Sequence, residues 1–138
     1  MTETKNIELS IQKLYLCKDM LEKLLQLAKD EKERREWEFY AKIGIISNDW
    51  TNLYTAFMLK TLKYSESEYF NQLKSFVDYI WEIELRKALA EKMKGEYCES
   101  EFWERINSNP FFREYILLEK RYKQNKNTNH QNSVGKVK

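Results

Sequence analysis

Helix breakers are almost absent from this chain, which has only three glycines and one proline among 138 residues. Glycine and proline end regular structure most strongly, whereas the abundant Glu, Lys, Leu and Gln favour helix. A chain of this length forms one ordinary domain and can bury a core without disulfides or metal. We therefore predict an all-α protein: a compact bundle of five to six helices over residues 1–123, followed by a disordered basic tail over residues 124–138.

Apolar periodicity and capping signals set the predicted helix boundaries. Ser65 and Glu68 form a capping box, Gly95 ends the helix that this box begins, and Asn109 precedes the only proline. Asn48 is the predicted N-cap of an earlier helix. The expected helices cover approximately residues 5–30, 33–46, 49–63, 66–94, 99–107 and 110–123.

The first predicted helix is apolar over more than half of its circumference. Leu9 and Leu16 belong to a second apolar row beside the heptad-like seam that Ile7 and Ile11 begin. A helix of this kind is buried on two sides, or it packs its own core and also meets a partner. Leu9 and Leu16 are therefore candidate partner-binding residues, and self-association through this helix is one possibility.

The apolar face of the predicted helix 66–94 changes position along its length. Glu84, Lys87 and Glu91 occupy the angular sector that apolar residues hold up to Ile83. Either the helix kinks near residues 82–84, or its two halves pack against different neighbours.

Aromatic residues make up 14% of the chain, which is high for a small bundle. Most of them fall on inner helix faces, but a bundle of this size has difficulty enclosing all of them. Partly exposed tryptophans are favoured anchors of protein interfaces. The candidate partner-binding tryptophans are Trp37, Trp50, Trp81 and Trp103.

Charge gives only weak support for nucleic-acid binding. The formal net charge is +2, and the last fifteen residues contribute three lysines and no acid, so the remainder is close to neutral. Proteins that bind nucleic acid usually show a clear basic excess. The best candidate contacts lie in the last helix and the tail: Arg113, Lys120, Arg121, Lys123 and Lys126.

No catalytic residue can be named from the sequence. The only histidine, His130, falls in the predicted disordered tail, where nothing would hold it in a catalytic geometry. Carboxylates at helical spacing would suit a magnesium-dependent nucleotide hydrolase, but solvated charge runs are the commoner explanation. These pairs are Glu33 with Glu36, Asp78 with Glu82 and Glu101 with Glu104.

The remaining sequence features concern location and origin. Cys17 and Cys98 are expected to be free thiols, and the chain shows neither a signal peptide nor an apolar run of membrane-spanning length. These features predict a cytoplasmic protein that binds no membrane. The preference for residues with AT-rich codons suggests a low-GC bacterium or its phage.

The sequence thus favours a small non-enzymatic protein-interaction or regulatory module without catalytic, cofactor-binding or metal-ligating residues. A nucleic-acid accessory protein is the first alternative, and a magnesium-dependent nucleotide hydrolase is the second.

Overall fold

A computed structural model describes the backbone of residues 2–137 and the side chains of residues 4–123. Over this range the chain forms seven helices and no strand, which confirms the predicted all-α class. The helices are α1 (Thr2–Leu16), α2 (Lys18–Leu25), α3 (Glu31–Ser47), α4 (Thr51–Lys60), α5 (Glu66–Met93), α6 (Glu99–Ser108) and α7 (Pro110–Val137). None of the described helices is both long enough and apolar enough to cross a membrane.

The helix count exceeds the prediction because the first predicted helix bends at Cys17. This residue has φ −107° and ψ 9°, and its backbone separates α1 from α2. A residue of another helix stabilises the bend, since Arg86 Nη1 of α5 donates a hydrogen bond to Leu16 O at 3.1 Å. Beyond the bend, α2 buries Met20, Leu21, Leu24 and Leu25, whereas most of the apolar residues of α1 stay partly or largely exposed.

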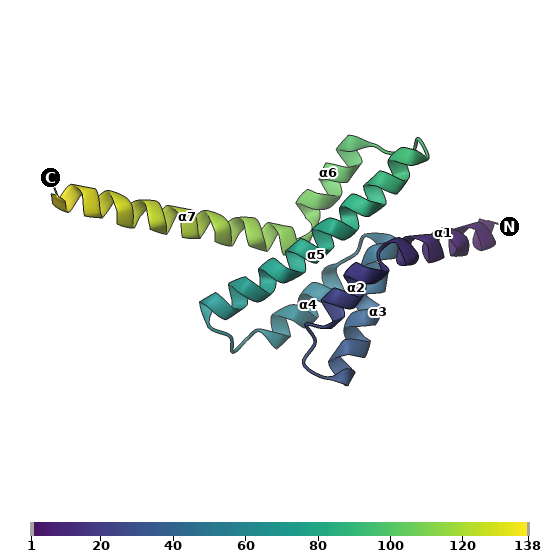
Figure 1. Cartoon of the computed structure of the whole chain (residues 1–138), viewed down its shortest axis with the longest axis horizontal. Coiled ribbons are helices and arrows are strands. Elements are labelled where there is room, and N and C mark those ends of the chain that lie inside the picture. The colour runs from purple at the N-terminus through teal and green to yellow at the C-terminus, as the bar shows by residue number, and fades with distance from the viewer. Residues whose placement is uncertain (1, 138) are drawn as a thin grey trace.

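Helix α5 runs through the middle of the molecule, while α1 and α7 project from the body in opposite directions (Figure 1). The first half of α5 packs into a core of aromatic rings. Phe76 stacks on Phe111 of α7 with centroids 5.4 Å apart, and it lies 4.9 Å from Phe57 of α4 and 5.1 Å from Trp37 of α3. These four rings are enclosed from water and supply much of the apolar area that stabilises the fold.

Three of the predicted caps are confirmed. The Ser65 hydroxyl accepts a hydrogen bond from Glu68 N at 3.2 Å, and Gly95 has the positive φ of 74° expected after a helix. Asn109 Oδ1 accepts a hydrogen bond from Phe111 N at 2.9 Å where α7 begins.

The predicted N-cap at Asn48 is wrong. Asn48 ends α3 in the left-handed conformation, with φ 60°, and the N-cap of α4 is Trp50. An asparagine tolerates this conformation better than most residues, so the short link between α3 and α4 turns there.

The predicted disordered tail falls within the last part of α7, where the backbone is helical to Val137. The side chains from residue 124 onward lie outside those that the structure describes. Disorder of this segment therefore stays a prediction.

Candidate functional site

The six candidate partner-binding residues do not form one surface. Trp37 and Trp50 are 1% and 2% exposed, so both belong to the core and are not surface contacts. Their burial has a physical reason: Trp37 packs edge-on against Phe76, and Trp50 lies against Gly44, where no Cβ keeps the indole away. The expectation that these two rings reach the surface is wrong.

The other four candidates stay at least partly accessible. Trp81 is half-buried and packs against Trp103 with centroids 6.2 Å apart, while Trp103 itself is 45% exposed. Leu9 is half-buried beside α5, and Leu16 is 41% exposed at the end of α1.

The basic candidates lie along α7. The side chains of Arg113, Lys120, Arg121 and Lys123 are exposed, and Lys123 forms an ion pair of 3.0 Å with Glu119. Lys126, like His130, lies outside the described side chains.

The paired carboxylates do not assemble into a metal site. Glu33 binds Lys60 at 3.3 Å, Glu82 binds Arg86 at 3.3 Å, and Glu101 lines a cleft that Glu104 does not reach. Among the described residues, no group of three or more His, Cys, Asp or Glu side chains is placed to hold a metal ion.

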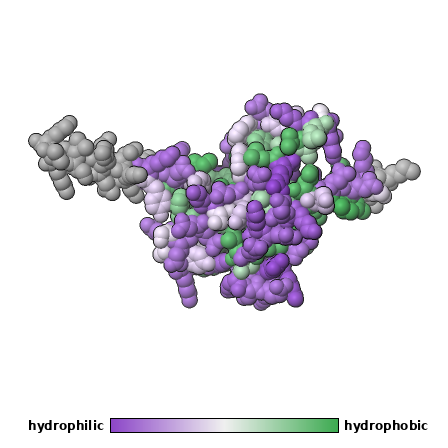
Figure 2. Space-filling view, in the orientation of Figure 1, coloured by the Kyte–Doolittle hydropathy of each residue, from purple (hydrophilic) through white to green (hydrophobic). Residues whose placement is uncertain are grey.

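One outer face of α1 carries large apolar side chains that nothing in the described chain covers. This face is formed by Ile7, Ile11 and Tyr15, with Leu16 at its C-terminal edge, and we call the four residues the α1 apolar face. The first three are 59%, 60% and 79% exposed, and in the view of Figure 2 hydrophobic residues reach the surface along α1. An exposed apolar face of this kind on a projecting helix is typical of an interaction site.

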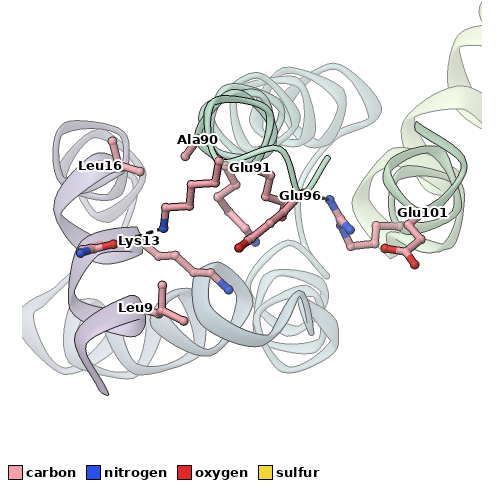
Figure 3. A pocket seen from close by; sticks show the side chains of 11 residues that line it. Leu9, Lys13, Leu16, Ala90, Glu91, Glu96 and Glu101 are labelled. Carbon is pink, nitrogen blue, oxygen red and sulfur yellow. Dashed lines mark hydrogen bonds and ion pairs between the residues drawn. The ribbon is translucent and has the colours of Figure 1, made fainter. Parts of the chain in front are cut away.

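A cleft of about 260 Å³ lies on another side of α1, between this helix, the second half of α5 and α6. Figure 3 shows Lys13 reaching into it from α1, with Glu91 and Glu96 in the middle and Glu101 on the far side. Its lining residues are Leu9, Gln12, Lys13, Leu16, Lys87, Ala90, Glu91, Lys94, Glu96, Glu101 and Arg105.

Beneath the cleft lies a buried cluster of charged groups centred on Glu84, and two of its members, Lys87 and Arg105, also line the cleft. Glu84 and Lys87 are each 2% exposed, and the Lys87 Nζ to Glu84 Oε1 distance is 3.4 Å. Trp50 Nε1 donates to Glu84 Oε1 at 3.3 Å, and Lys87 Nζ also donates to Asn48 Oδ1. The left-handed turn at Asn48 thus places both an amide oxygen and an indole against this ion pair.

Arg105 of α6 also belongs to the cluster, but it forms ion pairs there without hydrogen bonds. Its Nε lies 3.9 Å from Glu84 Oε2 and its Nη2 lies 3.8 Å from Glu91 Oε2, which is ion-pair range but too long for hydrogen bonds. Glu84 Oε2 and these two Arg105 nitrogens are buried without a hydrogen-bond partner. Such atoms cost about 1–3 kcal/mol each, so the buried cluster has unmet hydrogen-bonding capacity.

Burial also changes the acid–base behaviour of groups in and beside this cluster. It lowers the pKa of Lys87, an effect that nearby Lys13 reinforces and Glu84 opposes. The adjacent Cys17 is fully buried, and burial raises the pKa of its thiol to about 11. Both shifts have the same main cause, since burial disfavours the charged form of each group.

The sequence did not predict this cleft as a site, although it showed charged residues in the sector of α5 that faces the interior. Glu84, Lys87 and Glu91 were expected to mark either a kink or a change of neighbours, and α5 continues without interruption from Glu66 to Met93. Of the two predictions, the one in which the halves of α5 pack against different neighbours is correct. Charged residues that continue a buried helical sector indicate a buried ionic cluster, and this pattern would have located the site.

Comparison with known proteins found no matching family model, no similar curated protein and no similar solved structure.

Proposed function

We propose that this protein is a small non-enzymatic interaction module that acts through the α1 apolar face. The observation that carries the proposal is the exposure of Ile7, Ile11 and Tyr15, at 59%, 60% and 79%, on a helix that projects from the body (Figure 1). Large apolar side chains in water are unfavourable by about 1.5–3 kcal/mol each relative to burial, so covering them favours association.

The occupant that best fits this face is α1 of a second copy, docked antiparallel. Ile7, Ile11 and Tyr15 recur every four residues, so they form one row along the helix. A two-fold pairing centred on Ile11 sets that residue against its own copy and sets Ile7 against Tyr15 of the second copy. The row is therefore complementary to itself, apolar against apolar over its whole length.

Two physical arguments favour the antiparallel orientation over the parallel one. The body of each molecule follows the C-terminal end of α1, so parallel pairing would bring two bodies together at the same end (Figure 1). Antiparallel pairing places them at opposite ends. It also opposes the two helix dipoles, whereas parallel pairing sets like ends side by side.

The expected dimer is weak. One helix face with four large apolar side chains covers less than the roughly 800 Å² per partner found in stable complexes. Association also costs translational and rotational freedom, so we expect a dissociation constant in the micromolar range. Such a module would be regulated by its own concentration or by a competing amphipathic helix.

Sedimentation velocity over a concentration series tests this proposal. The wild-type chain should shift toward dimer as concentration rises, and Ile11→Asp should abolish the shift without loss of helical circular dichroism. The matched control is Leu62→Asp, a residue that is 74% exposed after α4 and should leave the dimer intact.

Disulfide crosslinking identifies the orientation of the pairing. In a Cys98→Ser background, Ile11→Cys should crosslink to its own copy on mild oxidation, and Leu62→Cys should not. A mixture of the Ile7→Cys and Tyr15→Cys chains should form the mixed dimer in excess over either like pair. Like pairs in excess would show parallel pairing. A wild-type chain that stays monomeric at all concentrations, or an equal loss in the Leu62→Asp control, would overturn the proposal.

A nucleic-acid accessory role is the second candidate, supported by α7. Arg113, Lys120 and Arg121 are exposed, and none has a carboxylate within 4.0 Å among the described side chains. Fluorescence anisotropy with single-stranded DNA and RNA tests this role. Binding should weaken steeply with salt and should disappear when residues 124–138 are removed.

A further inference from the structure

We infer that the cleft between α1, α5 and α6 binds a small zwitterion, a molecule of the α-amino-acid class that carries one carboxylate and one ammonium group. This binding site is distinct from the α1 apolar face, with which it shares only Leu16. It does not depend on dimer formation.

The balance of charges in the cleft favours a dipolar ligand over a polyanion. Four cationic residues line it, Lys13, Lys87, Lys94 and Arg105, and three acidic residues share the same lining, Glu91, Glu96 and Glu101. The lining therefore carries both signs of charge in nearly equal number. A nucleotide or other polyphosphate would face several carboxylates at close range, which is unfavourable in a partly enclosed site.

Two of the cations bind only neutral oxygens. Lys13 Nζ donates to Ile46 O at 3.3 Å, and Lys94 Nζ donates to Gln12 Oε1 at 3.4 Å. Neither ammonium has a carboxylate within ion-pair distance among the described side chains. Both therefore keep donors available for the carboxylate of a ligand on the α1 side of the cleft.

The opposite side of the cleft offers acceptors. Glu96 follows α5, and Glu101 lies in the first turn of α6; neither forms an ion pair with a described basic side chain. Figure 3 places Lys13 on the α1 side and Glu101 on the far side, with Glu96 between them. A ligand ammonium near the two glutamates and a ligand carboxylate near Lys13 and Lys94 would meet opposite charges at both ends.

The size and the remaining lining agree with a small ligand. Cavities for drug-sized molecules measure about 300–1,000 Å³, and this cleft is smaller, at about 260 Å³. Leu9, Leu16 and Ala90 supply an apolar wall that can contact the side chain of the ligand.

Isothermal titration calorimetry with the twenty common L-amino acids, at millimolar concentration, is the first test. For the amino acid that binds best, the N-acetyl derivative removes the ammonium and the carboxamide removes the carboxylate. We expect each blocked form to bind at least about tenfold more weakly, because each loses one charge-assisted contact.

Two variants show which end of the cleft holds which group. Lys13→Gln should lower the affinity for the free amino acid about tenfold and remove the preference over the carboxamide, while the preference over the N-acetyl form remains. Glu101→Gln should give the reverse pattern. Lys63→Gln and Glu66→Gln change exposed charges outside the cleft and should bind like the wild type.

The inference is overturned if no amino acid binds, if the blocked forms bind as well as the free one, or if inorganic phosphate binds with equal affinity. The dimer measurement above has an independent outcome, since Ile11 lies outside the cleft lining.

Discussion

The two halves of α5 present the same angular sector to the interior, yet one half meets aromatic rings and the other meets charges. Up to Ile83 the inward residues are Leu73, Phe76, Ile80 and Ile83, all fully enclosed. After it they are Glu84 and Lys87, almost equally enclosed, and Glu91 at the edge of the cleft. The neighbours change accordingly, from Phe57 and Phe111 to Trp50, Asn48 and Arg105.

This difference separates a region whose contacts are all satisfied within the chain from one that keeps unsatisfied polar atoms. Aromatic rings need only close packing, and their contacts are made within the chain. A buried ion pair needs full hydrogen bonding to offset its desolvation, and here Glu84 Oε2 and two Arg105 nitrogens lack it. A group kept buried with unmet polar capacity is a candidate for ligand binding.

The largest effect is expected in the aromatic half. Phe76→Ala should lower the free energy of unfolding by about 3–5 kcal/mol, because it leaves a cavity among rings that cannot close over it. Urea denaturation measures the change. Phe39→Ala is the matched control, since Phe39 is 64% exposed and should cost little. Equal costs for the two substitutions would show that the three rings around Phe76 do not form the stabilising core.

A somewhat smaller loss of stability is expected in the ionic half, and a second substitution should offset part of it. Lys87→Met should cost about 3 kcal/mol, because it leaves the Glu84 carboxylate buried without its ammonium partner. The double variant Glu84→Met with Lys87→Met should recover part of this loss, because both desolvation costs disappear while Trp50 Nε1 and Arg105 lose their carboxylate partner. Urea denaturation of both variants checks this, and an additive loss in the double variant would contradict the contrast between the two halves.

The smallest change concerns thiol reactivity and leaves stability untouched. Cys17, beside the ionic half, is enclosed and burial raises its pKa to about 11, whereas a hydrogen bond with Ser100 lowers the pKa of Cys98. Iodoacetamide at neutral pH should therefore modify Cys98 first, and Cys17 only after unfolding. Mass spectrometry of the digested protein locates the modified thiol. Rapid labelling of Cys17 in the native chain would show that the bend between α1 and α2 opens readily.

Much of the fold could be predicted because its signals are local. Ser65, Gly95 and Asn109 act on backbone groups within three residues of themselves, so their roles are visible in the sequence. Asn48 misled the prediction because the same residue type favours both an N-cap and a left-handed helix end. The bend at Cys17 had no local sign, since Arg86, which binds the end of α1, lies 70 residues away.

The candidate site was harder to predict because its groups come from distant segments. The sequence indicated that the first helix has more apolar surface than a core can enclose, and the exposure of Ile7, Ile11 and Tyr15 agrees with this. It did not indicate which tryptophans are buried, since Trp50 packs against Gly44 and donates a hydrogen bond to Glu84, 34 residues away in the chain. Nor did it show that Lys13, Glu101 and Arg105 would line one cleft.

The sequence by itself determined that the chain is helical, where most of its helices begin and end, and that one face of the first helix is apolar in excess, because propensity, capping and periodicity act over a few residues. Only the tertiary structure decided that α5 carries its charges into the interior and that three helices enclose them in a cleft. Those outcomes depend on contacts between residues far apart in the chain, whose strength is set by burial and by the distances between charges.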